Sequence, residues 1–356
     1  MAEKVLMKGN EALAEAAIMA GCRHYFGYPI TPQTEVAAYM AKRMPKIGGV
    51  FLQAESEVAA INMVLGAAAC GVRSMTSSSS PGISLKSEGI SYIAGSDLPA
   101  LIVNVQRGGP GLGGIQPSQS DYYQTTKGGG HGDYKLIVLA PDSVQEMFSL
   151  TFKGFDIADR YRMPVMLLTD GTIGQMMEPV SLDLEEVKSY DKPWATTGTK
   201  NHQGRNVINS LSLNATQLEE WNKSRFERYA EVEKNEVMYE EYLMEDAEYC
   251  LVSFGIAARV SKNAVIELRK KGIKAGLIRP ITLWPFPVDA LKKAAEKVKA
   301  FVSVELNMGQ MITDIKLSID CKKPVYLCNR TGGVIVGTDE VVKKVEEIEK
   351  GEAKAW

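Results

Sequence analysis

The sequence lacks the signals that mark several large classes of protein. No apolar run approaches the roughly 18 residues that a membrane-spanning helix needs, and the N-terminal residues contain no apolar core of a secretory signal. Lysine plus arginine (41 residues) nearly balances aspartate plus glutamate (43 residues), so charge gives no reason to expect nucleic acid or an anionic membrane. We therefore expect a cytoplasmic protein with no nucleic-acid partner and no membrane partner.

Motifs for metal binding and for self-contained hydrolysis are also missing. The five cysteines include no C-x-x-C pair, so their spacing predicts neither an iron–sulfur cluster nor a zinc site, and we expect reduced thiols. The three histidines, at positions 24, 131 and 202, lack metal-ligand spacing. Because no H-E-x-x-H, G-x-S-x-G or phosphate-loop string occurs, we expect no metal ion on this chain and no hydrolase activity.

A regular alternation of strand-like and helix-like segments fills the first 180 residues of the 356-residue chain. Apolar runs predict strands at 24–26, 49–53, 73–76, 101–105, 136–139 and 165–168. Amphipathic stretches predict helices at 9–20, 32–43, 57–70, 82–94 and 143–162. This alternation is typical of an α/β domain with a mostly parallel sheet, whose functional loops lie at the carboxyl ends of the strands.

The remainder of the chain reads as a connector and a second α/β unit. Periodicity fades from 181 to about 215, and a long charged helix is predicted at 216–245, packed across the domain junction or facing a partner. Strands at 250–255, 273–280, 300–305 and 325–327 and a helix at 257–271 then repeat the strand–helix logic. We therefore predict domains at 1–180 and 247–356, joined by a connector at 181–246.

Two glycine-rich loops and an arginine follow the predicted strand 101–105. Arg107 ends this strand at the carboxyl edge of the sheet, where its planar guanidinium group could bind a carboxylate or a phosphate, or form a surface ion pair. Glycines permit close backbone approach, so the two loops suggest the rim of a site, with mobile surface loops as the alternative. The loop glycines are at 108, 109, 111, 113 and 114, and at 128, 129, 130 and 132.

Three polar turns lie between predicted strands and helices. Glu57, two residues after Glu55, opens a helix, where a carboxylate usually complements the helix dipole. The turn Tyr28-Pro29-Ile30-Thr31-Pro32 places Thr31 where it could cap the next helix. The turn SSSSPG, residues 77–82, could bind an anion through backbone N–H groups. Each turn has a structural explanation when it is taken alone.

Taken together, these segments resemble one known family. YPITPQTE, QAESEVAAINMVLGAAACG, SSSSPGISLKSEGISY, LPALIVNVQRGGPGLG and LLTDG occur in the order found in 2-oxoacid:ferredoxin oxidoreductases. The first 180 residues resemble the pyrimidine-binding domain of these thiamine-diphosphate enzymes, and LIRPITLWPFP and VELNMGQM resemble their transketolase-C-terminal-like domain. The resemblance is greatest to alpha-type subunits of the 2-oxoisovalerate members, with 2-oxoglutarate and pyruvate members close behind.

The resemblance implies roles for five residues. It implies that Glu57 contacts N1′ of the cofactor's aminopyrimidine as a catalytic residue, with Tyr28 and Pro29 beside it in the cofactor site. It also implies that Thr31 and Arg107 bind the carboxylate and carbonyl end of the 2-oxo acid. The implied reaction is coenzyme-A-dependent oxidative decarboxylation, with electrons passed to ferredoxin. A non-catalytic binding paralogue is the alternative.

One motif of thiamine enzymes is absent. Their diphosphate and magnesium site uses G-D-G followed by an asparagine, and the nearest string here, Thr169-Asp170-Gly171, lacks the first glycine and the asparagine. The resemblance therefore implies a beta-type partner subunit that carries the diphosphate and magnesium end of thiamine diphosphate. It implies iron–sulfur clusters on partner chains, including gamma and ferredoxin-like delta subunits.

Overall fold

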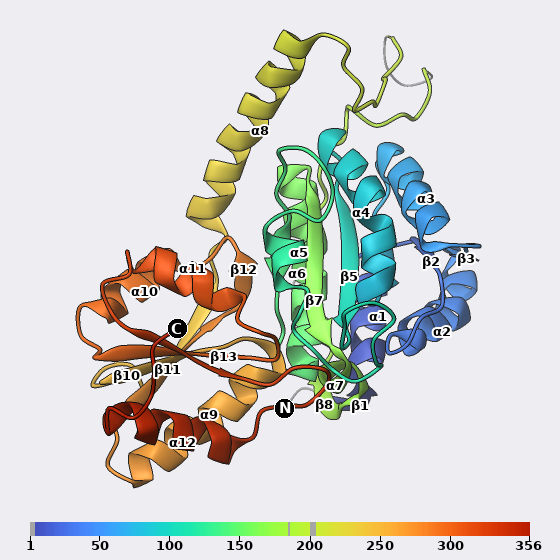
Figure 1. Cartoon of the computed structure of the whole chain (residues 1–356). Helices are drawn as coiled ribbons and strands as arrows, with labels where there is room; N and C mark the ends of the chain where they lie inside the picture. Colours follow the sequence, from blue (N-terminus) through green and yellow to red (C-terminus); the bar gives the residue numbers. More distant parts are fainter. Residues whose placement is uncertain (1–3, 184–185, 200–203) are drawn as a thin grey trace.

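The computed structural model describes residues 4–183, 186–199 and 204–356. Part of the predicted connector, and His202, lie outside these ranges. Two sheets dominate the molecule: the seven-stranded sheet is the centre of the first lobe, and the five-stranded sheet is the centre of the second lobe (Figure 1). None of the helices in the described ranges combines the length and the apolar character needed to cross a bilayer.

The first lobe is built on a seven-stranded sheet with the order β12-β6-β7-β5-β4-β2-β3. All pairs are parallel except β12 with β6. Its strands are β2 (His24–Gly27), β3 (Val50–Gln53), β4 (Ser74–Ser78), β5 (Ala100–Gln106), β6 (Ile137–Leu139), β7 (Pro164–Asp170) and β12 (Thr282–Trp284). The central strands β4, β5 and β7 are buried along their whole length, as expected for a sheet covered on both faces.

Helices cover this sheet in two pairs. α1 packs against α6, and α3 packs against α4, while both α4 and α6 contact the central strands (Figure 1). The helices of this lobe are α1 (Gly9–Met19), α2 (Thr34–Arg43), α3 (Glu57–Ala69), α4 (Ser80–Gly95), α5 (Tyr122–Thr126), α6 (Val144–Tyr161) and α7 (Gly171–Gln175), with a 3-10 turn, η1 (Met44–Ile47). A small antiparallel sheet joins β1 (Lys4–Lys8) to β8 (Met177–Ser181). The α/β architecture predicted for this part is confirmed.

The second lobe holds a five-stranded sheet with the order β14-β13-β10-β11-β9, in which β9 alone is antiparallel to its neighbour. Its strands are β9 (Tyr239–Tyr242), β10 (Tyr249–Val252), β11 (Ala275–Pro280), β13 (Ala300–Glu305) and β14 (Val325–Asn329). Its helices are α9 (Gly255–Lys270), α10 (Val288–Ala295), α11 (Met311–Ser318) and α12 (Thr338–Glu349). The second α/β unit predicted from the sequence is therefore present.

Two predictions about helix ends are wrong. The long helix α8 (Ala215–Asn235) ends ten residues before the predicted position, because residues 239–242 pair with β11 as strand β9. Helix α2 begins at Thr34 with Gln33 as its N-cap, so Thr31 does not cap it. Thr31 lies three residues upstream, and its backbone serves another contact described below.

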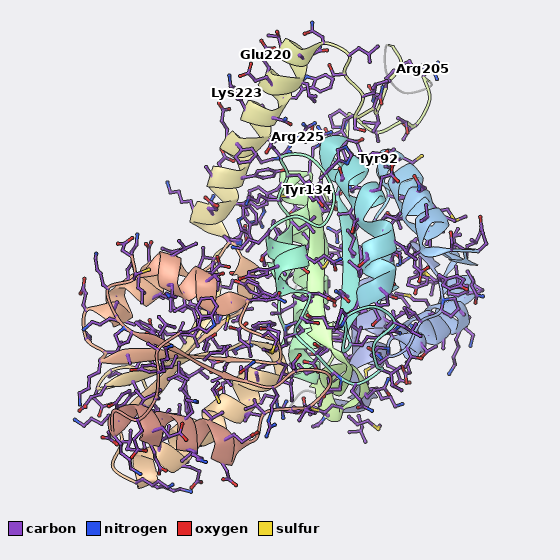
Figure 2. All side chains as sticks on the ribbon, viewed as in Figure 1. Tyr92, Tyr134, Arg205, Glu220, Lys223 and Arg225 are labelled. Atoms are coloured by element: carbon purple, nitrogen blue, oxygen red, sulfur yellow. The ribbon has the colours of Figure 1, made fainter. Side chains whose placement is uncertain are left out.

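Helix α8 extends away from both sheets (Figure 1), and it is buried at Arg225, Tyr229 and Val232. Arg225 anchors it by donating to the Asp97 carboxylate at 3.0 Å, and Figure 2 shows Arg225 on the side of the helix that faces the first lobe. Glu220 and Lys223 lie farther out along the same helix. The proposed division of the chain at residues 180 and 246 stays a prediction.

Candidate active site

Arg107 lies directly after β5 and is the buried cation at the carboxyl edge of the first sheet. It is 8% exposed, and its Nη1 and Nη2 atoms donate to the carbonyl oxygens of Thr31 (3.1 Å) and Leu112 (3.2 Å). Its Nε atom is buried without a partner, and it forms no ion pair with a carboxylate of the described residues. A buried guanidinium group without an acid partner is well suited to bind an anion from solution.

The structure brings Thr31 and Arg107 together, through the Thr31 backbone. The Thr31 side chain is exposed, as are Tyr28 and Pro29 in the same turn. Behind the turn, the Gln33 side chain donates to the Tyr28 carbonyl oxygen at 3.4 Å and accepts from Ser77 Oγ at 2.5 Å. The turn is therefore fastened to β4, and its exposed side chains face outward at the sheet edge.

Glu57 is the first residue of α3 and is 7% exposed. Ser56 caps the helix by accepting from the Ala59 backbone N–H at 3.1 Å, so the cap does not depend on Glu57. The Glu57 carboxylate accepts no hydrogen bond from a described residue. It lies against Gly82, where an added Cβ atom would be 2.8 Å from Glu57 Oε1 and 2.1 Å from Ser78 Oγ.

The groups around Gly82 fit the aminopyrimidine end of a thiamine cofactor. Ser78 Oγ is buried without a hydrogen-bond partner, and the nearby Glu57 carboxylate has unused acceptor capacity. An aminopyrimidine ring presents N–H donors and ring-nitrogen acceptors that could satisfy both groups. Because residue 82 is a glycine and has no Cβ atom, the Glu57 and Ser78 side chains can occupy the space beside it.

A cleft of about 600 Å³ contains Arg107 and lies between the two lobes. Its walls come from the start of α4, the glycine-rich loop after β5 and the loop after β13; the lining residues are Ser80, Pro81, Ser84, Arg107, Gly108, Gly109, Pro110, Gly111, Ser120, Asp121, Asn307, Met308, Gln310 and Thr331. Glu57 does not line this cleft. Both residues instead contact the first turn of α4. The Arg107 backbone N–H donates to Ser80 Oγ, and the Glu57 carboxylate lies against Gly82.

One buried lysine on α4 is not among the predicted site residues. Lys86 is fully buried on α4, and its ammonium group donates to the Ser77 carbonyl oxygen at 3.1 Å. Burial lowers the pKa of Lys86 to about 7, although the Glu57 carboxylate opposes the shift. A signal was available, because Lys86 occupies a position in the apolar stripe of Ile83, Ile90 and Ile93.

The Thr169-Asp170-Gly171 string has a structural role. Asp170 Oδ1 accepts from the backbone N–H groups of Thr172 (2.8 Å) and Ile173 (3.2 Å), and Oδ2 accepts from Ile256 at 3.4 Å. Burial raises the pKa of Asp170 to about 6, against the effect of these donors. Within the described residues, no three His, Cys, Asp or Glu side chains gather closely enough to hold a metal ion.

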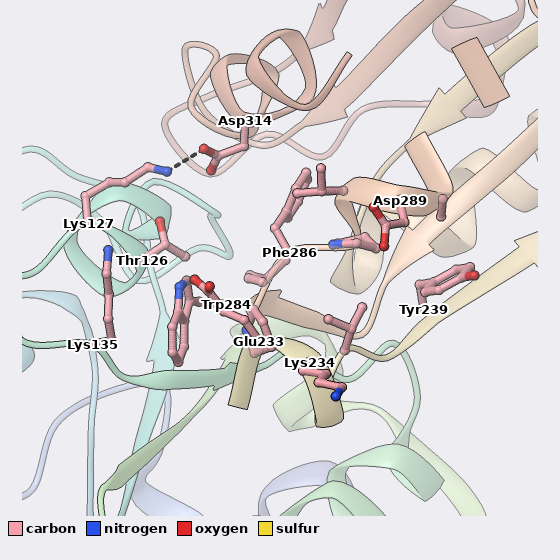
Figure 3. A pocket seen from close by; sticks show the side chains of 16 residues that line it. Thr126, Lys127, Lys135, Glu233, Lys234, Tyr239, Trp284, Phe286, Asp289 and Asp314 are labelled. Atoms are coloured by element: carbon pink, nitrogen blue, oxygen red, sulfur yellow. Dashed lines mark hydrogen bonds and ion pairs between the residues drawn. The ribbon is translucent and has the colours of Figure 1, made fainter. Parts of the chain in front are cut away.

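A second cavity, of about 610 Å³, lies where α8 meets the second lobe (Figure 3). It is lined by Trp284 and Phe286, with Lys127 paired to Asp314 at its rim. None of the predicted site residues lies there. The candidate active site is therefore at the sheet edge around Arg107 and Glu57.

The parallel first sheet, the second α/β lobe and the buried carboxylate at the start of α3, which accepts no hydrogen bond from a described residue, fit a thiamine-diphosphate-binding fold. Residues 15–242 match the family described as pyruvate flavodoxin/ferredoxin oxidoreductase, thiamine diphosphate-binding, and residues 247–341 match pyruvate:ferredoxin oxidoreductase core domain II. The chain belongs to the 2-oxoacid:ferredoxin oxidoreductase family. The family and the fold predicted from the sequence are confirmed.

Similar proteins cover nearly the whole chain. It is 51% identical to the ketoisovalerate oxidoreductase subunit VorB of Methanothermobacter marburgensis, over 96% of this chain and 97% of that one. It is 38% identical to the 2-oxoglutarate synthase subunit KorA of Archaeoglobus fulgidus, over 98% of this chain and 99% of that one.

Solved structures share this fold. The structure of 2-oxoglutarate:ferredoxin oxidoreductase from Magnetococcus marinus, with 2-oxoglutarate, coenzyme A and succinyl-CoA bound, superposes with a TM-score of 0.86 at 29% identity. The match covers 97% of this chain and 65% of that chain. A split-gene transketolase, an inactive beta4 tetramer, shares the fold at a TM-score of 0.61, 14% identity and 97% coverage of both chains.

Proposed function

We propose that this chain is the alpha-type subunit of a coenzyme-A-dependent 2-oxoacid:ferredoxin oxidoreductase that acts on branched-chain 2-oxo acids, with 2-oxoisovalerate as its substrate. The observation that carries the proposal is Arg107, a buried guanidinium group without a carboxylate partner in a cleft of about 600 Å³. The 51% identity to a ketoisovalerate oxidoreductase subunit supports the substrate.

Arg107 would bind the carboxylate that all 2-oxo acids share. Its Nε atom has no partner, and its two Nη atoms are held by backbone carbonyl groups that fix the plane of the guanidinium group. A carboxylate could therefore be bound in a defined orientation, with its 2-oxo carbon facing the Thr31 turn. Thr31, Tyr28 and Pro29 would form the wall on that side.

Glu57 would hold a proton at the cofactor's N1′ atom. Bound thiamine diphosphate supplies the carbon nucleophile that attacks the 2-oxo group and accepts the electrons of decarboxylation. The Glu57 carboxylate has no hydrogen bond to a described residue, so it can accept one from N1′ and favour the ring tautomer that removes the proton from that carbon. Burial of Glu57 keeps water from competing for this bond.

The charges in the cleft support a monocarboxylate substrate. Among its described lining residues Arg107 is the one cation, while Pro81, Pro110 and Met308 offer apolar surface. A second carboxylate, as in 2-oxoglutarate, would have no cation of this cleft to pair with and would lie near Asp121. An apolar branched side chain has no such requirement.

The other half of the catalytic machinery would lie on partner chains. Asp170 is buried and accepts from three backbone N–H groups, so the string most similar to the diphosphate motif serves the fold of this chain. We therefore assign the diphosphate and magnesium site to a beta-type subunit, and the iron–sulfur clusters to gamma and ferredoxin-like delta subunits that pass electrons to ferredoxin. The cytoplasmic location stays a prediction from the sequence.

Reconstitution tests this proposal. The purified chain, alone and with its beta-type partner, is titrated with thiamine diphosphate and magnesium by calorimetry, and the complete complex is assayed for coenzyme-A-dependent viologen reduction. We expect binding and turnover with the partner present, and 2-oxoisovalerate preferred over 2-oxoglutarate and pyruvate. Micromolar cofactor binding or turnover by the isolated chain would contradict the division of the site, and preference for 2-oxoglutarate would contradict the substrate.

A further inference from the structure

Lys86 is a fully buried lysine that has no role in the proposed reaction so far. It lies four residues after Gly82 on α4, on the face that packs against α3, and helix side chains tilt toward the N-terminus. Its ammonium group therefore extends back toward Gly82, the residue against which the Glu57 carboxylate lies, and toward the Ser77 carbonyl oxygen at the end of β4.

The hydrogen bonds of Lys86 leave most of its donor capacity unused. Its ammonium group makes one hydrogen bond, to Ser77, and no ion pair within 4.0 Å to a described residue. A lysine is rarely buried without a compensating charge, because desolvation of the ammonium group is costly. Two things can stabilise a lysine in such a place: a lowered pKa, as Lys86 has, and a nearby carboxylate that stops short of direct contact.

Glu57 is the carboxylate in position to supply that charge. α3 contains no other titratable residue, and β4 and β5 contain none. On β7 the one acid is Asp170, which is bonded to three backbone N–H groups.

The remaining titratable groups near α4 have partners of their own. From β2, the Tyr25 hydroxyl group bonds to Ser77 Oγ at 2.7 Å, and burial raises its pKa to about 12. Asp121 accepts from Ser80 Oγ and Asn104, and burial raises its pKa. Near the other end of α4 the His131 ring lies beside Ser91, and on α4 itself the exposed Glu88 accepts from Tyr92.

We propose that Lys86 is a positioning residue that acts through Glu57: the charge of its buried ammonium group holds the Glu57 carboxylate beside Gly82, where it can accept a hydrogen bond from an aminopyrimidine N–H. The inference rests on the proposed function for the identity of that ligand. Without the ammonium group, no cation of α3, α4, β4, β5 or β7 would attract the Glu57 carboxylate toward Gly82.

The electrostatic link can be measured on the full-length chain without cofactor or partner. Selective labelling of lysine side chains allows the titration of Lys86 to be followed by NMR, with Lys86→Met used to assign its signal. We expect Glu57→Gln to lower the pKa of Lys86, because the Glu57 charge raises it in the parent chain. An unchanged Lys86 titration in Glu57→Gln would overturn the proposal.

A double-mutant cycle provides a second, independent measurement. Lys86→Met should lower the urea midpoint when Glu57 is present and should leave it unchanged or raise it in the Glu57→Gln background, where no buried carboxylate loses its partner. Equal shifts in both backgrounds would overturn the proposal. Lys292→Met, which removes an exposed lysine from α10, is the matched control and should shift neither.

The catalytic consequence is read from the kinetics of the assembled complex. Lys86→Met should lower kcat about tenfold and leave KM for 2-oxoisovalerate within about twofold, because Glu57 is no longer held in place at the cofactor whereas Arg107 still binds the substrate carboxylate. An unchanged kcat would overturn the link to the cofactor. Lack of turnover in the parental complex would instead contradict the proposed function, and the titration and the cycle would still decide the link between Lys86 and Glu57.

Discussion

Two buried glutamates, one in each lobe, lie where a parallel sheet meets the start of a helix, and their surroundings differ. Glu305, at the end of β13, accepts hydrogen bonds from Ser303 Oγ and from the backbone N–H groups of Gln310, Met311 and Ile312, at 2.7 to 3.0 Å. Glu57 accepts none from the described residues. The first carboxylate stabilises a loop, whereas the second retains its capacity for a ligand.

Two buried arginines repeat the contrast. Arg279 on β11 is 3% exposed and donates to both oxygens of Glu146 at 2.7 Å and to Glu240 at 2.9 Å. Arg107 has backbone carbonyl partners and an unpartnered Nε atom. At the carboxyl edge of the first sheet, Ser78 Oγ, Ser79 Oγ, Arg107 Nε and Thr169 Oγ1 are buried without a partner among the described residues, whereas Glu305 and Arg279 of the second lobe have partners.

The largest effect is expected at Glu57. Glu57→Gln keeps the size of the side chain but removes its charge, so turnover of the assembled complex should fall about 100-fold or more while the chain still folds. In the matched variant Glu305→Gln, the lost charge weakens four hydrogen bonds, and the free energy of unfolding should fall by about 2 kcal/mol. Turnover of Glu57→Gln within threefold of the parent would remove the functional distinction between the two glutamates.

A smaller effect is expected at Arg107. Arg107→Ala removes the charge that pairs with the shared carboxylate, so kcat/KM should fall about 10- to 100-fold for 2-oxoisovalerate, 2-oxoglutarate and pyruvate alike. Arg279→Ala should instead destabilise the chain by about 3 kcal/mol, because Glu146 loses its buried partner. A loss of kcat/KM confined to one 2-oxo acid would show that Arg107 reads the substrate side chain.

The smallest effect is expected from two glycines. Gly82→Ala places a Cβ atom 2.1 Å from Ser78 Oγ and 2.8 Å from Glu57 Oε1, so it should lower the free energy of unfolding by about 1 kcal/mol and reduce turnover. Gly66→Ala, on α3 with open space around it, should raise that free energy by about 0.5 to 1 kcal/mol without changing turnover. Urea denaturation and the viologen assay distinguish the two. Equal behaviour of both variants would show that Gly82 gives no special room to Glu57.

The sequence was sufficient for strands β2 to β7 of the first sheet but not for β12, because continuous apolar runs such as Leu101–Val105 are diagnostic of buried parallel strands. It failed where pairing partners lie far away in the chain. In the sequence, the residues of β9 look like the end of a charged helix. They form a strand because they pair with β11, which lies some forty residues later. Short edge strands of this kind carry little local signal.

For the site, sequence spacing identified the residues but not their connections. The Thr31 carbonyl group holds Arg107, although the two residues are 76 positions apart. This contact depends on the path of the Thr31 turn, which the sequence does not specify. The Thr31 capping prediction failed for a related reason, since Asn10 and Gln175 hold the Pro32 carbonyl group and the helix starts two residues later. Lys86 was overlooked because a lysine within an apolar stripe looks like an interruption rather than a buried charge.

Each sheet has one antiparallel edge strand, β12 in the first and β9 in the second, and these two strands limit where the polypeptide could be cut into two fragments. β12 comes from the second half of the sequence and completes the first sheet, while β9 precedes the predicted boundary at 246 and completes the second. A cut near that boundary would leave β6 and β11 each with a bare row of backbone hydrogen-bonding groups, which invites aggregation. Expression as two separate fragments would therefore require both pieces together, since each fragment supplies the protective border of the other.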